Sequence, residues 1–424
     1  MLDELYSLGE ESGNDDKKYL HWDEFRHRIS PKSPLSAEEQ WAALKFFRSS
    51  KYQQLSFRDK SNQPFRFFLT QQTFSLLHNI DLHCGGGLSL PEEVTNQDTK
   101  DRYYVTSLIE ESLTSSQLEG AVVTRSEARE MIRSNRKPSN EHEKMVLNNF
   151  RTMRQLASWK EHDLNLDLIL EIHRSITLDT MDNPKDVGAL RTSDDINVVD
   201  EESNEVLHTP PTWKELPERL THLCEFANNL EIKGFLHPVI RSIILHFWLA
   251  YEHPFVDGNG RTARALFYWS MLKHGFWLFE FISISHEILK APKQYYRAFL
   301  HTETDGGDLN YFLHHQLTVI VKAIQALQDY IEGQRKELDK LYQHLRPADN
   351  FNHRQLALLK NALKHPNARY TVTSHQQSHG ISNQTARTDL QKLVDLQLFI
   401  SRRMGKAITF FPHPNIRETL SQDE

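Results

Sequence analysis

Chemically reactive side chains are concentrated in twelve residues, from His253 to Arg264, with the sequence HPFVDGNGRTAR. His253 is the one side chain in this stretch that can take up a proton near neutral pH. Asp257 offers hard oxygen ligands, which suit Mg²⁺ held against phosphates. Arg261 and Arg264 are three residues apart, so on a helix they share one edge and can grip phosphate oxygens. The combination predicts a site that handles nucleotide phosphates beside a reacting hydroxyl group.

The flanking residues are expected to form two helices that hold this stretch as a loop. The upstream run PVIRSIILHFWLAYEH predicts a buried helix, and the run RTARALFYWSML predicts a second helix. Between them, Gly258 and Gly260 permit backbone angles that close a turn and let a ligand approach. Unpaired N–H groups at the start of the second helix, and those of Gly258-Asn259-Gly260, predict a concavity that binds anions.

The same twelve residues match every position of the signature H-x-F-x-[DE]-G-N-G-R-x-x-R, so the chain resembles the Fic family. Fic proteins are all-helical domains that mostly transfer AMP from ATP to a protein hydroxyl group. The resemblance extends from about residue 104 to about residue 312, and it implies His253 as the catalytic base and Asp257 as the Mg²⁺ ligand. The positions expected to contact the nucleotide are Gly258, Asn259, Gly260, Arg261, Thr262, Ala263, Arg264 and, beside the adenine, Tyr296.

An upstream segment, SSQLEG from Ser115 to Gly120, fits the inhibitory pattern of the family, [ST]-x-x-x-E-[GN]. The stretch DRYYVTSLIEESLTSSQLEG predicts a helix with Gly120 as its C-terminal cap. Glu119 would then lie in the last turn, where the helix dipole disfavours a carboxylate and a cation is needed. By resemblance that cation is Arg264, so Glu119 would occupy the place that the γ-phosphate of ATP needs. Ser115, Glu119 and Gly120 are therefore the expected inhibitory residues.

Two short runs rich in β-branched residues, 195–199 and 205–209, predict a β-hairpin because a polar turn separates them. In Fic proteins a hairpin called the flap lies over the active site and aligns the target segment by main-chain pairing. Val206 and Leu207 are the expected contacts to the target. The preceding run Gly188-Ala189-Leu190-Arg191 resembles the G-x-x-R turn of the family and is expected to be structural.

Length and composition favour a soluble protein with two to four domains, and the apolar periodicity predicts that it is mainly helical. The chain has 424 residues, 38% of them hydrophobic, and a net charge of −7, which argues against a nucleic-acid coat. Its two cysteines, Cys84 and Cys224, have no metal-ligand spacing and fit a reducing compartment. The acidic N-terminus lacks a signal pattern, and no apolar stretch reaches the length of a membrane span. A cytoplasmic location without membrane contact is therefore expected.

Four sections are expected along the chain: an N-terminal Fic-associated helical region at 1–100, the Fic core with its inhibitory helix at 101–325, a helical linker at 326–350 and a winged helix-turn-helix at 351–414. Apolar residues at steps of four and three, such as Val146, Phe150, Met153 and Leu156, support helices in the core. Residues 315–345 read as one long helix. A coiled-coil dimer is the alternative for it, so a homodimer stays open.

The last section differs in charge from the remainder of the chain. Residues 351–414 hold nine Lys and Arg against two acids, a net charge of +7, and the remainder carries −14. Helices at 354–363, near 374–380 and at 382–396, followed by two strands, resemble a winged helix-turn-helix. Ser382 would open the recognition helix, and Arg402, Arg403 and Lys406 in the wing suit phosphates. DNA binding and protein contacts both remain open for this section.

The expected function is that of an autoinhibited protein adenylyltransferase. ATP with Mg²⁺ is the substrate, and the partner is a protein with a Ser, Thr or Tyr hydroxyl group, the chain itself being one candidate. His253 would remove the hydroxyl proton while the oxygen attacks the α-phosphorus. Two alternatives stay open: a nucleotide-sensing DNA-binding regulator, and a Fic enzyme that removes AMP through a water aligned by Glu119 or that uses another nucleotide.

Overall fold

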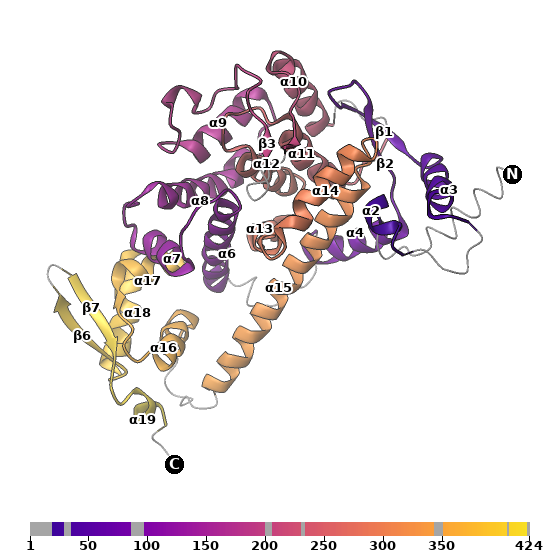
Figure 1. Cartoon of the computed structure of the whole chain (residues 1–424). Helices are drawn as coiled ribbons and strands as arrows, with labels where there is room; N and C mark the ends of the chain where they lie inside the picture. Colours follow the sequence, from indigo (N-terminus) through magenta and orange to yellow (C-terminus); the bar gives the residue numbers. More distant parts are fainter. Residues whose placement is uncertain are drawn as a thin grey trace.

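The computed structural model describes residues 19–28, 35–85, 97–199, 206–229, 234–342, 351–404 and 407–421. These residues are mainly helical, as the composition and periodicity predicted, and they form a large helical body and a smaller C-terminal unit (Figure 1). None of the described helices combines the length and the hydrophobicity that a membrane crossing requires.

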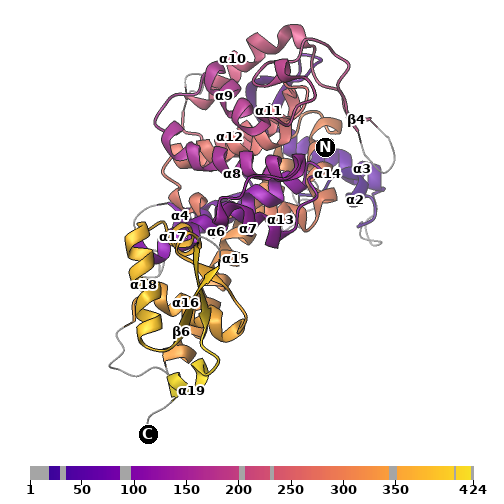
Figure 2. The same cartoon turned by 90° about the vertical axis from the view of Figure 1, so that its left-hand side faces the viewer.

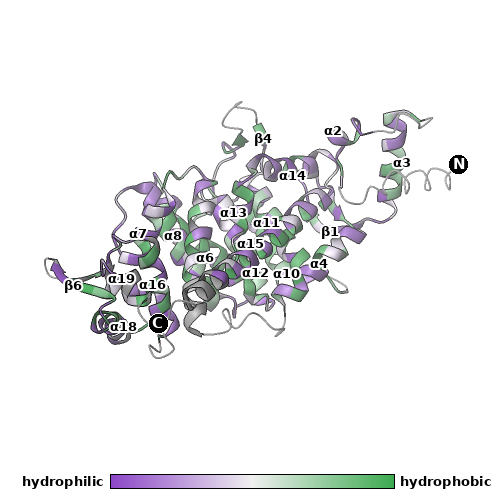
Figure 3. Ribbon diagram, turned by 90° about the horizontal axis from the view of Figure 1, so that it is seen from below, coloured by the Kyte–Doolittle hydropathy of each residue, from purple (hydrophilic) through white to green (hydrophobic). Residues whose placement is uncertain are grey.

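Two apolar helices form the centre of the larger body. Helix α11 (Pro238–Glu252) and helix α12 (Asn259–Lys273) pack against each other, and nearly all their residues are buried. Pro238 opens α11, where its missing N–H removes no helical hydrogen bond. Hydrophobic segments gather around these helices, and polar faces turn outward (Figure 3). The loop 253–258 therefore lies between two elements that the core fixes.

Four more helices belong to this body, and side chains cap the N-termini of three of them. Asn140 precedes α8, Asn165 precedes α9, and Thr124 forms a capping box before α7. Their bounds are α6 (Gln97–Gln117), α7 (Arg125–Ser134), α8 (Glu141–Trp159) and α9 (Leu166–Thr177).

The N-terminal region is not helical throughout, and this corrects the expectation for residues 1–100. Strands β1 (Gln53–Arg58) and β2 (Pro64–Phe67) form an antiparallel hairpin. Phe57, Phe65 and Phe67 are buried, because alternate residues of a strand share one face. The helices of this region are α2 (Trp22–Phe25), α3 (Ala37–Ser49) and α4 (Gln71–Cys84).

The remaining elements of the larger body include two very short strands. Strand β3 (Val198–Val199) pairs antiparallel with β4 (Val206–His208), so the strand is shorter than 195–199, and the expected turn lies outside the described residues. The long helix α15 (Asn310–Tyr342) starts earlier than expected, and residues 343–345 lie outside the described residues. The other elements are η1 (Pro184–Asp186), η2 (Trp213–Glu215), α10 (Leu216–Ala227), η3 (Trp277–Glu280), α13 (Ile284–Leu289) and α14 (Pro292–Thr304).

The C-terminal unit has a hydrophobic core of its own, built around Leu359, Leu390, Leu393 and Phe399. Its three strands are antiparallel in the order β5-β7-β6. Helix α17 of this unit packs against α6 and α7 of the larger body (Figures 1 and 2). The elements are α16 (His353–Lys364), β5 (Tyr370–Thr371), α17 (Val372–His379), α18 (Asn383–Asp395), β6 (Phe399–Met404), β7 (Ala407–Pro412) and α19 (Ile416–Ser421).

Candidate active site

His253 ends helix α11 in the left-handed conformation, with φ of 45°. Such a φ is uncommon for a residue with a side chain. Burial, reinforced by the nearby His208, lowers the pKa of His253 to about 4. The ring is therefore neutral at pH 7. Nδ1 lies 3.4 Å from the carbonyl of Ala250, a long contact that favours the proton on Nδ1 and leaves Nε2 able to accept one.

Hydrogen bonds inside the loop fix the backbone around this histidine. The Asn259 amide donates to the carbonyl of Phe255 and accepts from its N–H, both at 2.9 Å. The Arg191 Nε donates to the carbonyl of His253 at 3.0 Å, and the Arg191 N–H donates to the carbonyl of Pro254 at 2.9 Å. Arg191 is buried and also binds the carbonyl of Pro211. The turn at 188–191 thus holds the loop from one side.

His173 on α9 contacts the loop through Phe255 and Asp257, and the sequence did not predict this role. Its ring stacks on Phe255 with centroids 3.7 Å apart, and its Nε2 lies 2.9 Å from the carbonyl of Asp257. Its Nδ1 accepts from the N–H of Gly188, so Nε2 carries the proton and donates. A single histidine on an apolar helix face gives no sequence signal for this role, because only the fold brings α9 under the loop.

The N-terminus of α12 offers backbone N–H groups that can bind an anion. Gly258 caps the helix with φ of 82°, and a Cβ there would lie 2.8 Å from a methyl carbon of Thr177. The N–H groups of residues 259–261 are the ones that a helix start leaves without intrahelical acceptors. The N–H and the hydroxyl of Thr262 both donate to the carbonyl of Gly258. The N–H groups without an intrahelical acceptor are thus those of residues 259–261, and Ala263 is buried.

Arg261 is buried, and only part of its guanidinium has a hydrogen-bond partner among the described residues. Its Nη2 donates to the Asp257 carboxylate at 3.0 Å, while its Nε and Nη1 are buried without a hydrogen-bond partner among the described residues. Buried donors of this kind are costly unless a ligand satisfies them. Asp257 keeps 56% of its side chain exposed. One accessible carboxylate beside unsatisfied donors fits a phosphate group bound together with Mg²⁺.

Arg264 is already occupied by the residues of the inhibitory pattern. Its Nη2 donates to the Glu119 carboxylate at 2.8 Å and to the carbonyl of Ser115 at 2.9 Å, and its Nε donates to the Ser115 hydroxyl at 2.9 Å. Burial opposes the charge of Arg264, but the Glu119 carboxylate holds its pKa above the ordinary value. A Cβ at Gly260 would overlap the Glu119 carboxylate, which therefore lies directly over the start of α12.

Glu119 does not lie in the last helical turn, and this corrects the expected boundary. Helix α6 ends at Gln117, and residues 118–120 form a turn. Gly120 has φ of 84°, and the N–H of Ala121 donates to the carbonyl of Ser116, which is the bonding of a glycine cap. The cap lies where the sequence placed it, and the last α-helical residue comes earlier because the chain turns out toward Arg264.

The two tyrosines of α14 have different surroundings. The Tyr296 hydroxyl lies 3.5 Å from the carbonyl of Leu118, and 41% of the residue is exposed. Tyr295 is buried, and its hydroxyl lies 2.9 Å from Nε2 of His246. Tyr296 thus borders the turn at 118–120 that carries Glu119.

The expected target contacts lie on a strand that the core anchors. Val206 is 52% exposed and Leu207 is half-buried at the start of β4. His208, the next residue, binds the Glu303 carboxylate at 2.8 Å and the carbonyl of Tyr251 at 2.7 Å. The anchor at His208 was not foreseen. It fixes the end of the strand to α11 and leaves Val206 accessible.

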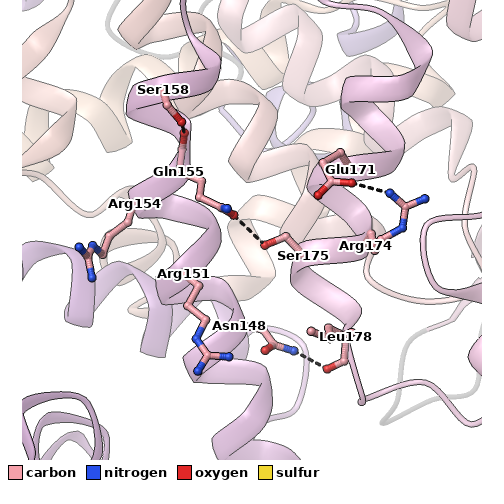
Figure 4. Close-up of a pocket in the computed structure, with 9 residues that line it drawn as sticks. All are labelled: Asn148, Arg151, Arg154, Gln155, Ser158, Glu171, Arg174, Ser175 and Leu178. Carbon is pink, nitrogen blue, oxygen red and sulfur yellow. Dashed lines mark hydrogen bonds and ion pairs between the residues drawn. The ribbon is translucent and has the colours of Figure 1, made fainter. Parts of the chain in front are cut away.

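A separate cavity of about 550 Å³ lies between α8 and α9 (Figure 4). Three arginines line it together with one acid, Glu171, which pairs with Arg174. None of its lining residues belongs to the loop 253–264. It is therefore not part of the candidate active site. The lining residues are Asn148, Arg151, Arg154, Gln155, Ser158, Glu171, Arg174, Ser175 and Leu178.

Comparison with known proteins gives the same family as the loop signature. Residues 163–271 match the model of the Fic/DOC family. Protein adenylyltransferase fic-1 of Caenorhabditis briggsae is 32% identical over 121 residues, which are 28% of this chain and 22% of that protein. The Caenorhabditis elegans protein of the same name is 34% identical over 118 residues, which are 28% of this chain and 21% of that protein.

A solved structure supports the fold over a larger part of the chain. A Fic family protein from Desulfovibrio desulfuricans G20 superimposes with a TM-score of 0.52 at 17% identity, covering 81% of this chain and 97% of that chain. Residues 163–271 of this chain are thus similar to the Fic/DOC family in sequence, and the larger part of the chain has the fold of a Fic family protein. The sequence matches span about a fifth of the length of the two worm proteins. The match to the family model includes the loop, α9 and α11.

Proposed function

We propose that this protein transfers AMP from ATP to a hydroxyl group of a protein, and that Glu119 inhibits the transfer. The observation that carries the proposal is a neutral, half-buried His253 next to a helix N-terminus and to Arg261, whose Nε and Nη1 donors are unsatisfied. A base and an anion site within one loop suit the attack of a hydroxyl group on a phosphate. The adenylyltransferase names of the worm relatives support the same reaction.

In the proposed reaction the phosphates of ATP bind the N–H groups of residues 259–261 and the guanidinium of Arg261. His253 takes the proton of the target hydroxyl through Nε2. The oxygen forms a bond to the α-phosphorus as the bond to the β-phosphate oxygen breaks, and pyrophosphate leaves. Base catalysis of this kind contributes about 10²–10⁴-fold, and positioning of the phosphates supplies most of the remainder.

Asp257 is the residue that would hold Mg²⁺, because its carboxylate is exposed at the start of the phosphate site. The ion, when bound, neutralises charge on the phosphates. Asp257 would then exchange part of its contact with Arg261 for the ion. That exchange leaves the Arg261 guanidinium free to face the nucleotide.

The inhibition follows from the position of the Glu119 carboxylate. It binds Arg264 at 2.8 Å and lies over Gly260, so a γ-phosphate arriving there meets a like charge and lacks a cation. ATP can still enter, but its α-phosphorus would be out of line with the incoming hydroxyl. A misplacement of about 1 Å costs roughly 100-fold in rate.

The protein target is proposed to pair with strand β4. Val206 and Leu207 are the residues whose backbone would align an extended target segment, a form of strand addition. Exposure of Val206 and the anchoring of His208 to α11 support this arrangement. A Ser, Thr or Tyr of the target would then face His253, and a hydroxyl of this chain is included among the targets.

The test compares wild type, Glu119→Gly and the double variant Glu119→Gly/His253→Ala, each incubated with labelled ATP, CTP, GTP or UTP, with and without cell lysate. We expect labelling by ATP to rise about 100-fold in Glu119→Gly and to disappear in the double variant. Glu119→Gln is the matched control, since it keeps the size of the side chain and weakens the ion pair. Equal or lower labelling in Glu119→Gly would contradict inhibition and would favour a water-aligning role of Glu119 in AMP removal.

A further inference from the structure

Helix α17 of the C-terminal unit contacts both helices that flank the inhibitory turn. It packs against α6, which precedes Glu119, and against α7, which follows it (Figures 1 and 2). The turn itself is short: six residues separate the end of α6 at Gln117 from the capping residue Thr124. Because α17 contacts the helices on both sides of this short connection, it restrains the turn that carries the Glu119 carboxylate.

The order α16-β5-α17-α18-β6-β7 is that of a winged helix, with α17 and α18 in the places of a helix-turn-helix. Ser382 caps α18, so the residues after it form its N-terminal turns. In helix-turn-helix proteins such residues of the second helix contact base edges, and the first helix crosses the DNA backbone. The exposed residues of α18 carry amide, hydroxyl and guanidinium groups that suit those contacts: Asn383, Gln384, Arg387, Thr388 and Gln391.

Charge favours DNA as the occupant of this surface. Residues 351–414 carry +7 in a chain of net charge −7. One of their two acids, Asp389, is buried and neutralised by Arg354 at 2.6 Å. Arg402 and Arg403 on β6 are exposed, at the place where a wing lies beside phosphates. The accessible charge of this unit is therefore strongly positive.

Most residues of α17 are partly or fully buried in the structure. Within this helix only Thr373 is exposed, and His375 and His379 are buried. Its own domain covers one side, and α6 and α7 pack against it as well. The docked position therefore hides part of the helix that would lie across the DNA backbone, so DNA and the larger body compete for α17.

We propose that duplex DNA binds α18 and strand β6, draws α17 away from α6 and α7, and thereby relieves the inhibition by Glu119. This inference rests on the proposed function. A ligand shifts an equilibrium only as far as its affinities for the two states differ, and here the undocked domain offers DNA more contacts than the docked one. The coupling must then act in both directions, so that a docked domain also weakens DNA binding.

When α17 leaves α6 and α7, we expect α7 to become more mobile and α6 to stay in place. Glu111 fixes α6 to the core, because its carboxylate accepts hydrogen bonds from Tyr268, Ser283 and Ser285 at 2.6–3.1 Å. Helix α7 has no such buried carboxylate: its acids Glu127 and Glu130 are exposed. Release of α17 would therefore loosen the chain after Gly120, and the turn that directs Glu119 at Arg264 would lose one of its two supports.

The experiment measures AMP incorporation by the full chain without DNA, with a mixed-sequence duplex at low salt and with heparin as a polyanion control. Three proteins are compared: wild type, Glu119→Gly and Arg402→Ala/Arg403→Ala. We expect the duplex to raise wild-type transfer by about fivefold or more, a change typical of allosteric coupling. The duplex should not raise transfer by Glu119→Gly, and the arginine variant should keep its basal rate but lose most of the response.

Hydrogen exchange on His253→Ala separates this inference from the proposed function, because it needs no transfer. Duplex should speed exchange in α7 and leave α12 unchanged. Faster exchange in α7 without AMP transfer by any variant would refute the proposed function and keep the coupling. A duplex that binds without affecting α7 or transfer would overturn the coupling. Absence of duplex binding at low salt would overturn the inference and leave protein contacts as the use of this surface.

Discussion

At the scale of single residues, His253 joins two properties that rarely occur together in a histidine. Its backbone is in the left-handed region, and its ring is buried enough to remain neutral well below pH 6. The left-handed backbone arises because His253 is the residue at which α11 ends and the loop begins. Hydrogen bonds from Asn259 and Arg191 hold that turn. Position and protonation state of the base therefore have the same cause, which is the packing around the end of α11.

The pH dependence of transfer tests this state of His253. A base is active when unprotonated, and burial lowers the pKa of His253 to about 4, so the active form predominates above that value. For Glu119→Gly we expect the transfer rate to stay level from pH 7.5 to about pH 5 and to fall about tenfold per unit below pH 4. Rates measured in short assays, with circular dichroism to follow the fold at each pH, give the profile. A midpoint near pH 6.5 would show an ordinary, solvated histidine.

Residue types in the loop could be predicted from sequence, but the state of each residue could not. The spacing from His253 to Arg264 gave the base, the carboxylate and both arginines, and the structure brings them into one site. Whether the donors of Arg261 and Thr262 have acceptors depends on which groups the fold brings within hydrogen-bond distance of them. His173 lies 80 residues before the loop, and no local pattern announces that contact.

At the scale of elements, the loop depends on neighbours that carry no chemistry. Arg191 donates to the carbonyls of His253, Ser193 and Pro211, and these bonds join the loop 253–258 to the segments before β3 and after β4. Each buried carbonyl that loses its donor costs about 1–3 kcal/mol. The turn at 188–191 was expected to be structural, and these contacts explain what it supports.

Arg191→Ala should destabilise the larger body by roughly 2–4 kcal/mol and lower transfer in the Glu119→Gly background, because the backbone of His253 loses its anchor. The matched control is Arg174→Ala, since Arg174 pairs with Glu171 at the surface and such pairs contribute about 0–1 kcal/mol. Thermal unfolding monitored by circular dichroism measures the stability of each variant, and AMP incorporation from labelled ATP measures transfer. Equal unfolding temperatures for the two variants would contradict the anchoring role of Arg191.

Element boundaries were predictable where a cap residue marks them and not elsewhere. The helix start predicted at Ser382 agrees with the structure, where Ser382 caps α18. Asn140 and Asn165 cap α8 and α9 in the same way, although no boundary was predicted at them. The β1–β2 hairpin was missed because its aromatic residues read equally well as helix packing, and only burial of alternate residues reveals a strand. The end of α6 was placed too late, since the turn at 118–120 is stabilised by the distant Arg264.

At the scale of the whole molecule, the chain separates an acidic body from a basic C-terminal unit. Opposite charges on two parts of one chain favour their docking as well as the attraction of DNA to one of them. The two hydrophobic cores are distinct, so the contact of α17 with α6 and α7 joins units that could move separately.

Salt dependence measures how many phosphates the basic unit contacts. For the full chain, the logarithm of the association constant for duplex DNA should fall linearly with the logarithm of salt concentration. Arg402→Ala/Arg403→Ala should reduce the slope by about 2, because each lost phosphate contact contributes about 0.9. Fluorescence anisotropy with a labelled duplex, at salt concentrations from about 50 to 200 mM, gives the slopes for wild type and for the variant. Identical slopes would show that these arginines do not contact phosphates.

The ion pair between Glu119 and Arg264 also bears on which nucleotide the resting protein holds. With Arg264 engaged, the remaining donors at α12 and Arg261 can bind two phosphates of ADP as well as they bind those of ATP. Calorimetric titration should therefore give similar affinities for ADP and ATP in wild type, and a clear preference for ATP in Glu119→Gly. An ATP preference of equal size in both proteins would speak against this. In its inhibited state, the protein would thus be insensitive to the ratio of ATP to ADP, and release of one carboxylate would make it sensitive to the energy state of its surroundings.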